Sequence, residues 1–446
     1  MVSQSLDSMS HPTSRTPLPR TTLYKSTLVF ALFALLCNVT SAQSGHVRIN
    51  ESANCLKFDS SAVAMKNFFT RWNSLDKDGH GRMSIMHIGG SHVQAGTMSH
   101  RIRKHLVQRC GASDRGLVFP YSAAAKCNNP ADYRISCKEK MGLTRNVYKE
   151  PQKQLGLCGI AVTAADTHST IRFWNNDTSI DWHTDRIVVM GYSPEGVVPT
   201  LLVDEREVWP SYVDEASRRF VFNLRNEVDS FAVVLPCDSL HTFTLTGIYL
   251  GNRKPGVSFH SVGVNGAAVP DYLNKCPYLV EDLKIVHPDM VIFGIGINDA
   301  AAKDFDTAAF RRNYLALCDS IRLVSPDCAF VFITNNDSFK RVKRGVYHVN
   351  RNGLLARDVF YRLAKETGGA VWDQFEIMGG LESMNKWRLD KLAQNDRIHF
   401  TRAGYELLAD LFAKAFFSTA KTMGSHSANN SKATPSASTD VPYLSY

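Results

Sequence analysis

The alternation of apolar and polar positions divides the chain into three regions. In the first, residues 60–127, and in the third, residues 257–420, short apolar runs alternate with segments of helical periodicity. The run at residues 83–88, for example, ends in two glycines and is followed by apolar residues at helical spacing. Strands that alternate with helices predict a parallel sheet covered by helices on both faces.

The third region repeats this pattern several times. Strands are expected at residues 257–264, 290–295, 329–333 and 370–372, and helices at residues 310–323, 354–365 and 402–417. The last helix is amphipathic, and Thr401 is placed to cap its first turn. Beyond it, residues 421–446 are rich in Ser, Ala, Asn and Thr, and we expect this tail to be disordered.

The middle region, residues 128–256, has a different pattern. Short β-rich runs follow one another at close spacing and are separated by turn residues such as proline, glycine and asparagine. These runs are residues 169–174, 186–190, 200–203, 219–224, 230–235 and 241–250. Many short strands of this kind predict an all-β sandwich. We therefore expect an α/β domain, built on a parallel sheet flanked by helices, that is interrupted by an inserted β-sandwich.

The amino-terminal segment, residues 1–42, has the pattern of a secretory signal peptide. Arg15, Arg20 and Lys25 precede an apolar run at residues 28–36, and a site of small residues follows. The apolar run is too short to span a bilayer comfortably, which argues against a membrane anchor. No other segment is long and apolar enough to cross a membrane. We expect an exported protein, periplasmic or secreted, without an integral membrane segment after cleavage.

Charge and composition narrow the classes of partner. The chain has 446 residues and a formal net charge of +9. Loss of the signal segment removes three basic residues and one acidic residue, which lowers the net charge to +7. A mildly basic exported protein can associate with anionic polymers such as cell wall or acidic glycans. No long basic helix or zinc-knuckle spacing indicates a nucleic-acid partner, no cofactor motif occurs, and the oligomeric state stays open.

The cysteines suggest two candidate bridges. Of the ten cysteines, nine remain after loss of the signal segment, so at least one is unpaired within a monomer. Cys127 with Cys137, and Cys318 with Cys328, are close enough in sequence to pair in an oxidising compartment. No Cys-x-x-Cys pair occurs, so we expect no structural zinc site.

Four short segments place chemically useful residues at expected strand or helix ends. Ser91, in His-Ile-Gly-Gly-Ser-His, lies just after a buried strand and just before a helix whose backbone N–H groups can stabilise negative charge. Gly266 and Asn298 follow two further strands, where a close backbone approach and a neutral amide donor suit an oxyanion. Asp396 precedes His399 by three residues, so that the carboxylate can orient the imidazole.

Each of these segments also has a purely structural interpretation. A serine at a strand-to-helix turn commonly caps the helix, and Gly266 suits an ordinary turn. Asn298 with the following aspartate is typical of a turn before a helix. The combination is more informative than any member, because it supplies a nucleophile, two oxyanion donors and an Asp–His pair at one sheet edge, where ligand sites of open parallel sheets lie.

The four segments resemble the sequence blocks of the SGNH hydrolases, also called the GDSL esterase/lipase family. The resemblance covers residues 80–127 and 257–418 and implies a three-layer fold. It also implies that Ser91 is the nucleophile, that Asp396 and His399 complete a catalytic triad, and that the Ser91 N–H, Gly266 and Asn298 form the oxyanion hole. Where the family usually has Gly-Asp-Ser, this chain has Gly-Gly-Ser. The missing carboxylate belongs to neither the triad nor the oxyanion hole, so we expect altered support of the loop.

A narrower resemblance is to bacterial peptidoglycan O-acetylesterases of this family, which carry a β-sandwich beside or within the catalytic domain. It implies a serine esterase that removes O-acetyl or other short acyl groups from a cell-wall or other carbohydrate polymer, without metal or cofactor. An O-acyltransferase, a lipase of the same fold and a catalytically silent glycan-binding protein remain alternatives. Trp174, Trp182 and Trp209 could stack on sugar rings in the inserted region, although tryptophan in a β-sandwich more often belongs to the core.

Overall fold

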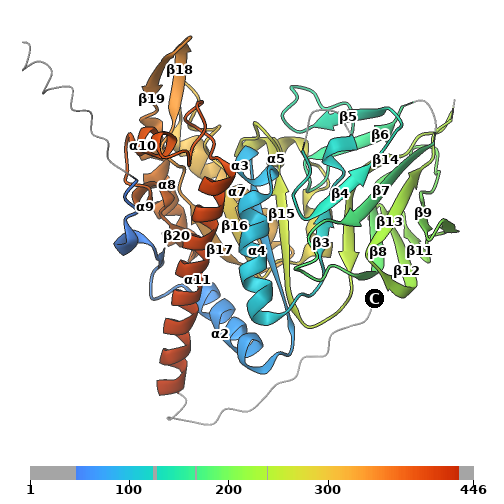
Figure 1. Cartoon of the computed structure of the whole chain (residues 1–446), viewed down its shortest axis with the longest axis horizontal. Helices are drawn as coiled ribbons and strands as arrows, with labels where there is room; N and C mark the ends of the chain where they lie inside the picture. Colours follow the sequence, from blue (N-terminus) through green and yellow to red (C-terminus); the bar gives the residue numbers. More distant parts are fainter. Residues whose placement is uncertain (1–46, 124–127, 166–167, 239, 431–446) are drawn as a thin grey trace, which may run out of the picture. The chain divides into compact units, whose positions relative to one another are not determined.

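A six-stranded sheet forms the centre of the α/β part (Figure 1). The computed structural model describes residues 47–430 except 124–127, 166–167 and 239, so the expected signal peptide and residues 431–446 of the expected tail lie outside it. Neighbouring strands are parallel, except that the edge strand β1 pairs antiparallel with β20. In sheet order, the strands are β1 (Leu56–Lys57), β20 (Ala370–Trp372), β17 (Ala329–Ile333), β16 (Met290–Gly294), β2 (Arg82–Gly89) and β15 (Gly256–Gly263).

Helices cover both faces of this sheet, because its strands are apolar on both sides. In β2, Met83 and Ile85 belong to one buried cluster, whereas Met86 and Ile88 belong to the other. The first cluster is covered by α2 (Val63–Asp78), α4 (Thr97–Cys110) and α11 (Arg402–Asn430). The second is covered by α5 (Val269–Lys275), α6 (Leu279–Val286), α7 (Thr307–Arg322) and α8 (Asn352–Thr367). The expected parallel sheet between two helical layers is thus confirmed.

Two antiparallel sheets form the inserted β region. One has the order β11-β12-β8-β14-β6-β5, with β3 paired to β14, and the other has the order β10-β9-β13-β7-β4. The bounds in the first sheet are β3 (Gly116–Val118), β5 (Met141–Arg145), β6 (Ile160–Ala164), β8 (Thr184–Tyr192), β11 (Tyr212–Asp214), β12 (Arg219–Val228) and β14 (Thr244–Gly251). Those in the second are β4 (Tyr133–Ser136), β7 (Ser169–Asn175), β9 (Thr200–Val203), β10 (Arg206–Val208) and β13 (Ser230–Leu235). The expected all-β insertion is confirmed.

The remaining elements are short. They are η1 (Glu51–Ala53), η2 (Tyr121–Ala123), α3 (Ser91–Gln94), α9 (Gln374–Ile377), α10 (Ser383–Leu389), and the hairpin of β18 (Phe339–Lys343) with β19 (Val346–Val349). Within the part of the chain that is described, no helix combines the length and the apolar character that a bilayer crossing requires.

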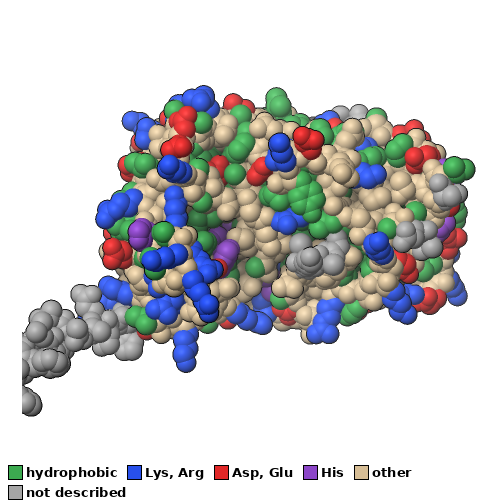
Figure 2. All heavy atoms as spheres, turned by 90° about the horizontal axis from the view of Figure 1, so that it is seen from above, with side chains coloured by type: hydrophobic (Ala, Val, Ile, Leu, Met, Phe, Trp, Pro, Cys, Tyr) green, Lys and Arg blue, Asp and Glu red, His purple; other side chains and the backbone are tan. Residues whose placement is uncertain are grey.

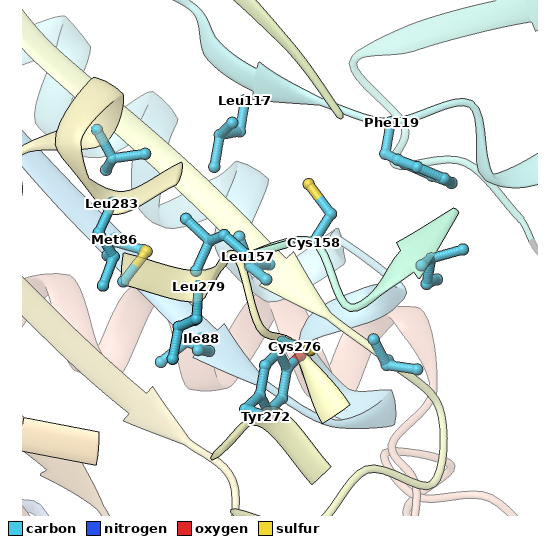
Figure 3. Close-up of a cluster of buried hydrophobic side chains, with 14 of the residues drawn as sticks. Met86, Ile88, Leu117, Phe119, Leu157, Cys158, Tyr272, Cys276, Leu279 and Leu283 are labelled. Atoms are coloured by element: carbon cyan, nitrogen blue, oxygen red, sulfur yellow. The ribbon is translucent and has the colours of Figure 1, made fainter. Parts of the chain in front are cut away.

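The inserted region shares a core with the α/β part. Leu117, Leu157 and Cys158 of the insertion pack among side chains of β2 and α6, and all of them are almost fully buried (Figure 3). On the α/β side, Met86 and Leu283 belong to the same cluster. Because burial of apolar surface is the main favourable term in folding, this shared cluster fixes the insertion against the α/β part.

A buried ion-pair network adds a second connection between the two parts. Asp132, just before β4, accepts hydrogen bonds from Arg103 of α4 (Nη1 to Oδ2, 2.8 Å) and from Arg115 (Nε to Oδ2, 2.6 Å). All three side chains are at most 7% exposed. Burial by itself would raise the pKa of Asp132, but the guanidinium groups of Arg115 and Arg103 lower the pKa below its usual range.

Replacing Asp132 by alanine should strongly destabilise the protein. The change leaves two buried guanidinium groups without their carboxylate, which typically costs about 3–5 kcal/mol. The free energy of unfolding, measured by urea titration, should fall by that amount. Glu205→Ala, which removes an exposed partner of Arg172, is the control and should leave it nearly unchanged. Equal stabilities of the two variants would contradict the structural role of Asp132.

Several elements differ from the sequence-based expectations. β3 lies within residues 60–127 but pairs with β14, so the chain enters the insertion before residue 128. The last helix was expected to end at residue 417 but continues to Asn430, where we expected a tail. The turns of α11 beyond residue 417 are stabilised in part by α2, because the Asn73 amide of α2 donates to the Ala420 carbonyl (2.9 Å).

The expected pairing of Cys318 with Cys328 is wrong, because both are free thiols. Cys318 lies on the buried side of α7, and the Cys328 Sγ donates to the Ala329 carbonyl (3.6 Å). Both thiols are therefore part of the core. Cys127, the proposed partner of Cys137, lies outside the described residues.

The three tryptophans of the insertion have different environments. Trp182 is 3% exposed and stacks on Tyr133 at 6.2 Å, so it belongs to the core. Trp209 is 63% exposed, and Trp174 is half-buried on β7. Only Trp209 of these three therefore presents most of its ring to solvent.

Candidate active site

Two glycines allow the ends of β2, β15 and β16 to meet closely. A Cβ on Gly89 would lie 2.6 Å from the Gly294 carbonyl oxygen, and one on Gly263 would lie 2.8 Å from the Gly90 carbonyl oxygen. Since Cβ atoms do not approach backbone this closely, the chain can only turn here because these side chains are absent. The turn ends β2 at Gly89 and starts α3 at Ser91.

Ser91 is the first member of a hydrogen-bonded chain of three side chains. Its Oγ lies 2.7 Å from Nε2 of His399, although the two residues are 308 positions apart in sequence. The Nδ1 of the same imidazole lies 2.7 Å from Oδ2 of Asp396. The histidine and aspartate side chains are 31% and 42% exposed, so a solute can reach these hydrogen-bonded side chains. The structure thus brings together the three residues that the sequence predicted as a triad.

The loop before α11 holds Asp396 in place through its own backbone. Oδ1 accepts hydrogen bonds from the N–H groups of Ile398 (2.9 Å) and His399 (3.0 Å), which leaves Oδ2 for the imidazole. Partial burial would raise the pKa of Asp396, but the hydrogen bonds from the His399 ring and backbone outweigh it and lower the pKa to about 2. The carboxylate is therefore ionised at neutral pH and can stabilise a protonated imidazole.

Arg397 gives this loop its shape. It has a left-handed backbone (φ +59°), which lets the chain turn back between the aspartate and the histidine. Its guanidinium carbon lies 4.4 Å from the centre of the Tyr347 ring and 5.3 Å from that of Phe339. Both rings belong to the β18–β19 hairpin, so that hairpin supports the loop through cation–π contacts.

The other two predicted site residues lie on neighbouring loops. Gly266 has a φ of +89° in an exposed turn after β15. The Asn298 amide donates to the Ala267 carbonyl (2.9 Å), and so links the loop after β16 to the turn that contains Gly266. Asp299 adds a further link, because its carboxylate accepts from the Val269 N–H (3.2 Å). Burial raises the pKa of Asp299 to about 6.

Gly90 occupies the position where Gly-Asp-Ser sequences have aspartate. A Cβ at this position would lie 3.3 Å from Nδ2 of Asn298 and 3.5 Å from the Ala267 carbonyl oxygen. The Asn298 amide therefore approaches the backbone at the serine turn, and little room is left for a larger side chain. The departure from the usual motif fits this close approach.

His92 is a site residue that the sequence analysis did not identify. Its ring centre lies 5.1 Å from that of His399, and its Nδ1 lies 2.8 Å from the Tyr405 hydroxyl. Burial, and secondly the nearby His399, lower the pKa of His92 to about 3, so this ring is neutral. A neutral ring places no positive charge beside His399. The only available signal was that His92 directly follows Ser91.

The site has no arrangement suited to a metal ion. His87 is paired with Ser99 (2.9 Å), while His100 is paired with Asp177 (2.7 Å), so these two histidines and His92 have different partners. Among the described residues, no group of three or more His, Cys, Asp or Glu side chains is placed to hold a metal.

Comparison with known proteins gives a family match for part of the chain. Residues 247–407 match the model of the GDSL-like lipase/acylhydrolase family, which covers the Gly266, Asn298, Asp396 and His399 segments but not Ser91. No protein among the curated sequences matches the chain.

Among solved structures, a peptidoglycan O-acetylesterase is similar over 82% of this chain and 99% of its own, with 21% identity and a TM-score of 0.68. An acetyl xylan esterase covers 36% of this chain and 81% of its own (16% identity, TM-score 0.29). A family two carbohydrate esterase from Cellvibrio japonicus covers 65% and 98% (9% identity, TM-score 0.26). By sequence, residues 247–407 of the chain are similar to the GDSL-like lipase/acylhydrolase family.

Proposed function

We propose that this protein is a serine esterase that removes O-acetyl or other short acyl groups from a cell-wall or other carbohydrate polymer. The observation that carries the proposal is the hydrogen-bonded chain from Ser91 through His399 to Asp396. This is the arrangement that activates a serine hydroxyl for attack on an acyl carbon. It lies at the carboxyl end of a parallel sheet, and residues 247–407 are similar to an acylhydrolase family.

The chemistry proceeds in two steps. His399 Nε2 takes the proton of the Ser91 hydroxyl, and the oxygen attacks the ester carbonyl to form a tetrahedral intermediate. The protonated imidazole, stabilised by Asp396, then gives its proton to the leaving sugar oxygen as the ester bond breaks, and an acyl-enzyme remains. In the second step His399 takes a proton from water as the water attacks the acyl group. The bond to Ser91 then breaks, His399 returns the proton to the Ser91 oxygen, and the acid is released.

Three groups are proposed to hold the developing oxyanion: the N–H groups of Ser91 and Gly266 and the Asn298 amide. The amide nitrogen of asparagine carries two hydrogens, and only one is needed for the Ala267 carbonyl. The second is available for the oxyanion. Preorganised donors of this kind contribute a large part of the catalysis in acyl transfer.

A carbohydrate substrate is supported by the architecture. The peptidoglycan O-acetylesterase that shares this fold aligns over nearly its whole length, which includes the inserted β region. We also propose that the chain is exported, because its amino-terminal segment has the pattern of a signal peptide and a cell-wall polymer lies outside the cytoplasm.

The decisive experiment is to measure acetate released from O-acetylated peptidoglycan and from acetylated xylan, with Ser91→Ala as control. Release by the wild type alone supports the proposal, and the ratio of the two rates identifies the polymer. Acyl transfer to added glycan would instead indicate a transferase, and a preference for long-chain nitrophenyl esters would indicate a lipase. If the wild type released no acid from any ester, the enzymatic proposal would be wrong.

Replacing Asn298 by alanine should slow turnover without unfolding the protein. Loss of one oxyanion donor costs about 2.7–4 kcal/mol in the transition state, which is roughly a 10²–10³-fold decrease in kcat. The measurement is kcat on 4-nitrophenyl acetate, with the melting temperature recorded in parallel. Asn226→Ala, at an exposed position of β12, is the matched control. An Asn298→Ala enzyme as fast as this control would remove Asn298 from the oxyanion hole.

A further inference from the structure

The connection between β5 and β6 leaves the inserted region and lies against the turn that contains Gly266. In Figure 1, β5 lies at the same edge of the protein as α3 and α5. Arg145, the last residue of β5, donates a hydrogen bond from Nη2 to the Asn265 carbonyl. Val147 Cγ1 lies 3.8 Å from the position that a Cβ of Gly266 would take. The insertion therefore contacts the loop that carries a proposed oxyanion donor.

This contact completes the support of the Asn265 backbone. The Asn265 N–H donates to Oε1 of Gln94 (2.6 Å), whose side chain is buried on α3 behind Ser91. The carbonyl of the same residue accepts from Arg145. This carbonyl belongs to the peptide group that also contains the Gly266 N–H, the proposed donor to the oxyanion. Arg145 therefore fixes the plane of that peptide group from the side of the insertion.

The outer side of the connection has features suited to a charged carbohydrate. The Tyr148 N–H donates to the Arg145 carbonyl (3.1 Å), so a tight turn holds the two residues together. The Tyr148 ring is 40% exposed, and aromatic rings stack well on sugar rings. Lys149 and Lys153 follow, with Glu150 as the one acidic residue between them. Seen from this edge, Lys and Arg side chains are interspersed with Asp and Glu side chains over the surface (Figure 2).

We propose that the β5–β6 connection is a wall of the active site. In this proposal, Arg145 is a positioning residue for the Gly266 peptide, and Tyr148 receives the sugar ring of an acylated polysaccharide that carries negative charge. The inference rests on the proposed esterase function and assigns substrate selection to the insertion. It places the specificity of the enzyme in a segment outside the residues that match the family model.

The role of Arg145 is tested by comparing Arg145→Met with Arg145→Lys. Methionine keeps part of the side-chain volume but removes every donor, whereas lysine can still donate to the Asn265 carbonyl. Arg145→Met should lower kcat on 4-nitrophenyl acetate about tenfold with little change in KM, because only the oxyanion donor loses its support. Arg145→Lys should recover most of this loss. If methionine and lysine variants were both as fast as the wild type, Arg145 would not position the loop.

The role of Tyr148 is tested by the ratio of kcat/KM on O-acetylated peptidoglycan to kcat/KM on 4-nitrophenyl acetate. Tyr148→Ala should lower this ratio about fivefold, since an aromatic stacking contact contributes about 1 kcal/mol. Tyr148→Phe, which keeps the ring, should preserve the ratio. Added salt should lower the wild-type ratio, because it screens attraction between the lysines and an anionic polymer. A ratio unaffected by Tyr148→Ala would overturn the assignment.

The outcomes separate this inference from the proposed function. If Ser91→Ala retains wild-type hydrolysis, the esterase mechanism itself is wrong. If Ser91→Ala is inactive while the Arg145 and Tyr148 variants match the wild type on both substrates, the mechanism stands and the wall is wrong. Melting temperatures of all variants exclude loss of the fold as the cause.

Discussion

Replacing Ser91 by alanine should lower kcat on a short-chain nitrophenyl ester by on the order of 10⁶-fold, the largest effect of any single change considered for this site. The substitution removes the oxygen that lies 2.7 Å from Nε2 of His399, so no acyl-enzyme can form at this position. Residual hydrolysis would come from the oxyanion donors acting on bound ester and water. Stopped-flow assays of the wild type and long steady-state assays of the variant together cover this range of kcat.

Covalent labelling gives a second test of Ser91 as the nucleophile. An organophosphonate should add its mass to Ser91 of the wild type and leave Ser91→Ala unmodified. Ser425→Ala, at an exposed position of α11, is the control and should keep both turnover and labelling. Substantial turnover by Ser91→Ala would show that another residue is the nucleophile.

Replacing Asp396 by asparagine should lower kcat by roughly 10⁴-fold, the second largest effect. Asparagine can still accept the backbone hydrogen bonds of Ile398 and His399 through its carbonyl oxygen, so the loop should stay folded. What is lost is the negative charge that orients the imidazole and stabilises its protonated form. Because the pKa of Asp396 is lowered to about 2, the wild-type pH–rate profile should show no transition from this carboxyl above about pH 3.

The chain contains a matched control for this experiment. Asp238 and His241 repeat the spacing of the proposed catalytic pair, and the Asp238 carboxylate accepts from both the backbone and the ring of His241. This second pair is exposed on the inserted region. Asp238→Asn should leave kcat unchanged. Equal losses in Asp238→Asn and Asp396→Asn would mean that the effect does not arise at the active site.

Much of the fold was predictable, because its signals are local. The strands at residues 200–203, 230–235, 329–333 and 370–372 coincide with β9, β13, β17 and β20. Strands that are short or lack an apolar run were missed, such as β5, whose residues Met-Gly-Leu-Thr-Arg pair only with β6. Such a segment forms a strand because it pairs with a neighbouring strand, and the local sequence pattern does not reveal that partner.

Several residues of the candidate site were predictable from the sequence, but their spatial contacts were not. Ser91, Asp396 and His399 were selected by residue type, by their place at expected element ends and by the resemblance to the SGNH hydrolases. His92 and Arg145 were missed, because each contacts the site through a residue that is distant in sequence: the rings of His92 and His399 lie 5.1 Å apart, and Arg145 donates to Asn265. Neither contact leaves a signal in spacing.

By itself, the sequence determined which segments become strands and helices and which polar residues lie at their ends, because these depend on periodicity over a few residues. Spacing alone did not distinguish Asp396 and His399 from Asp238 and His241; the place of the first pair before the last expected helix and the family resemblance did. Only the tertiary structure decided that the first pair meets Ser91, across 308 residues. The reason is physical: parallel pairing brings the ends of β2, β15 and β16 to one edge, and α11 with its preceding loop packs beside them.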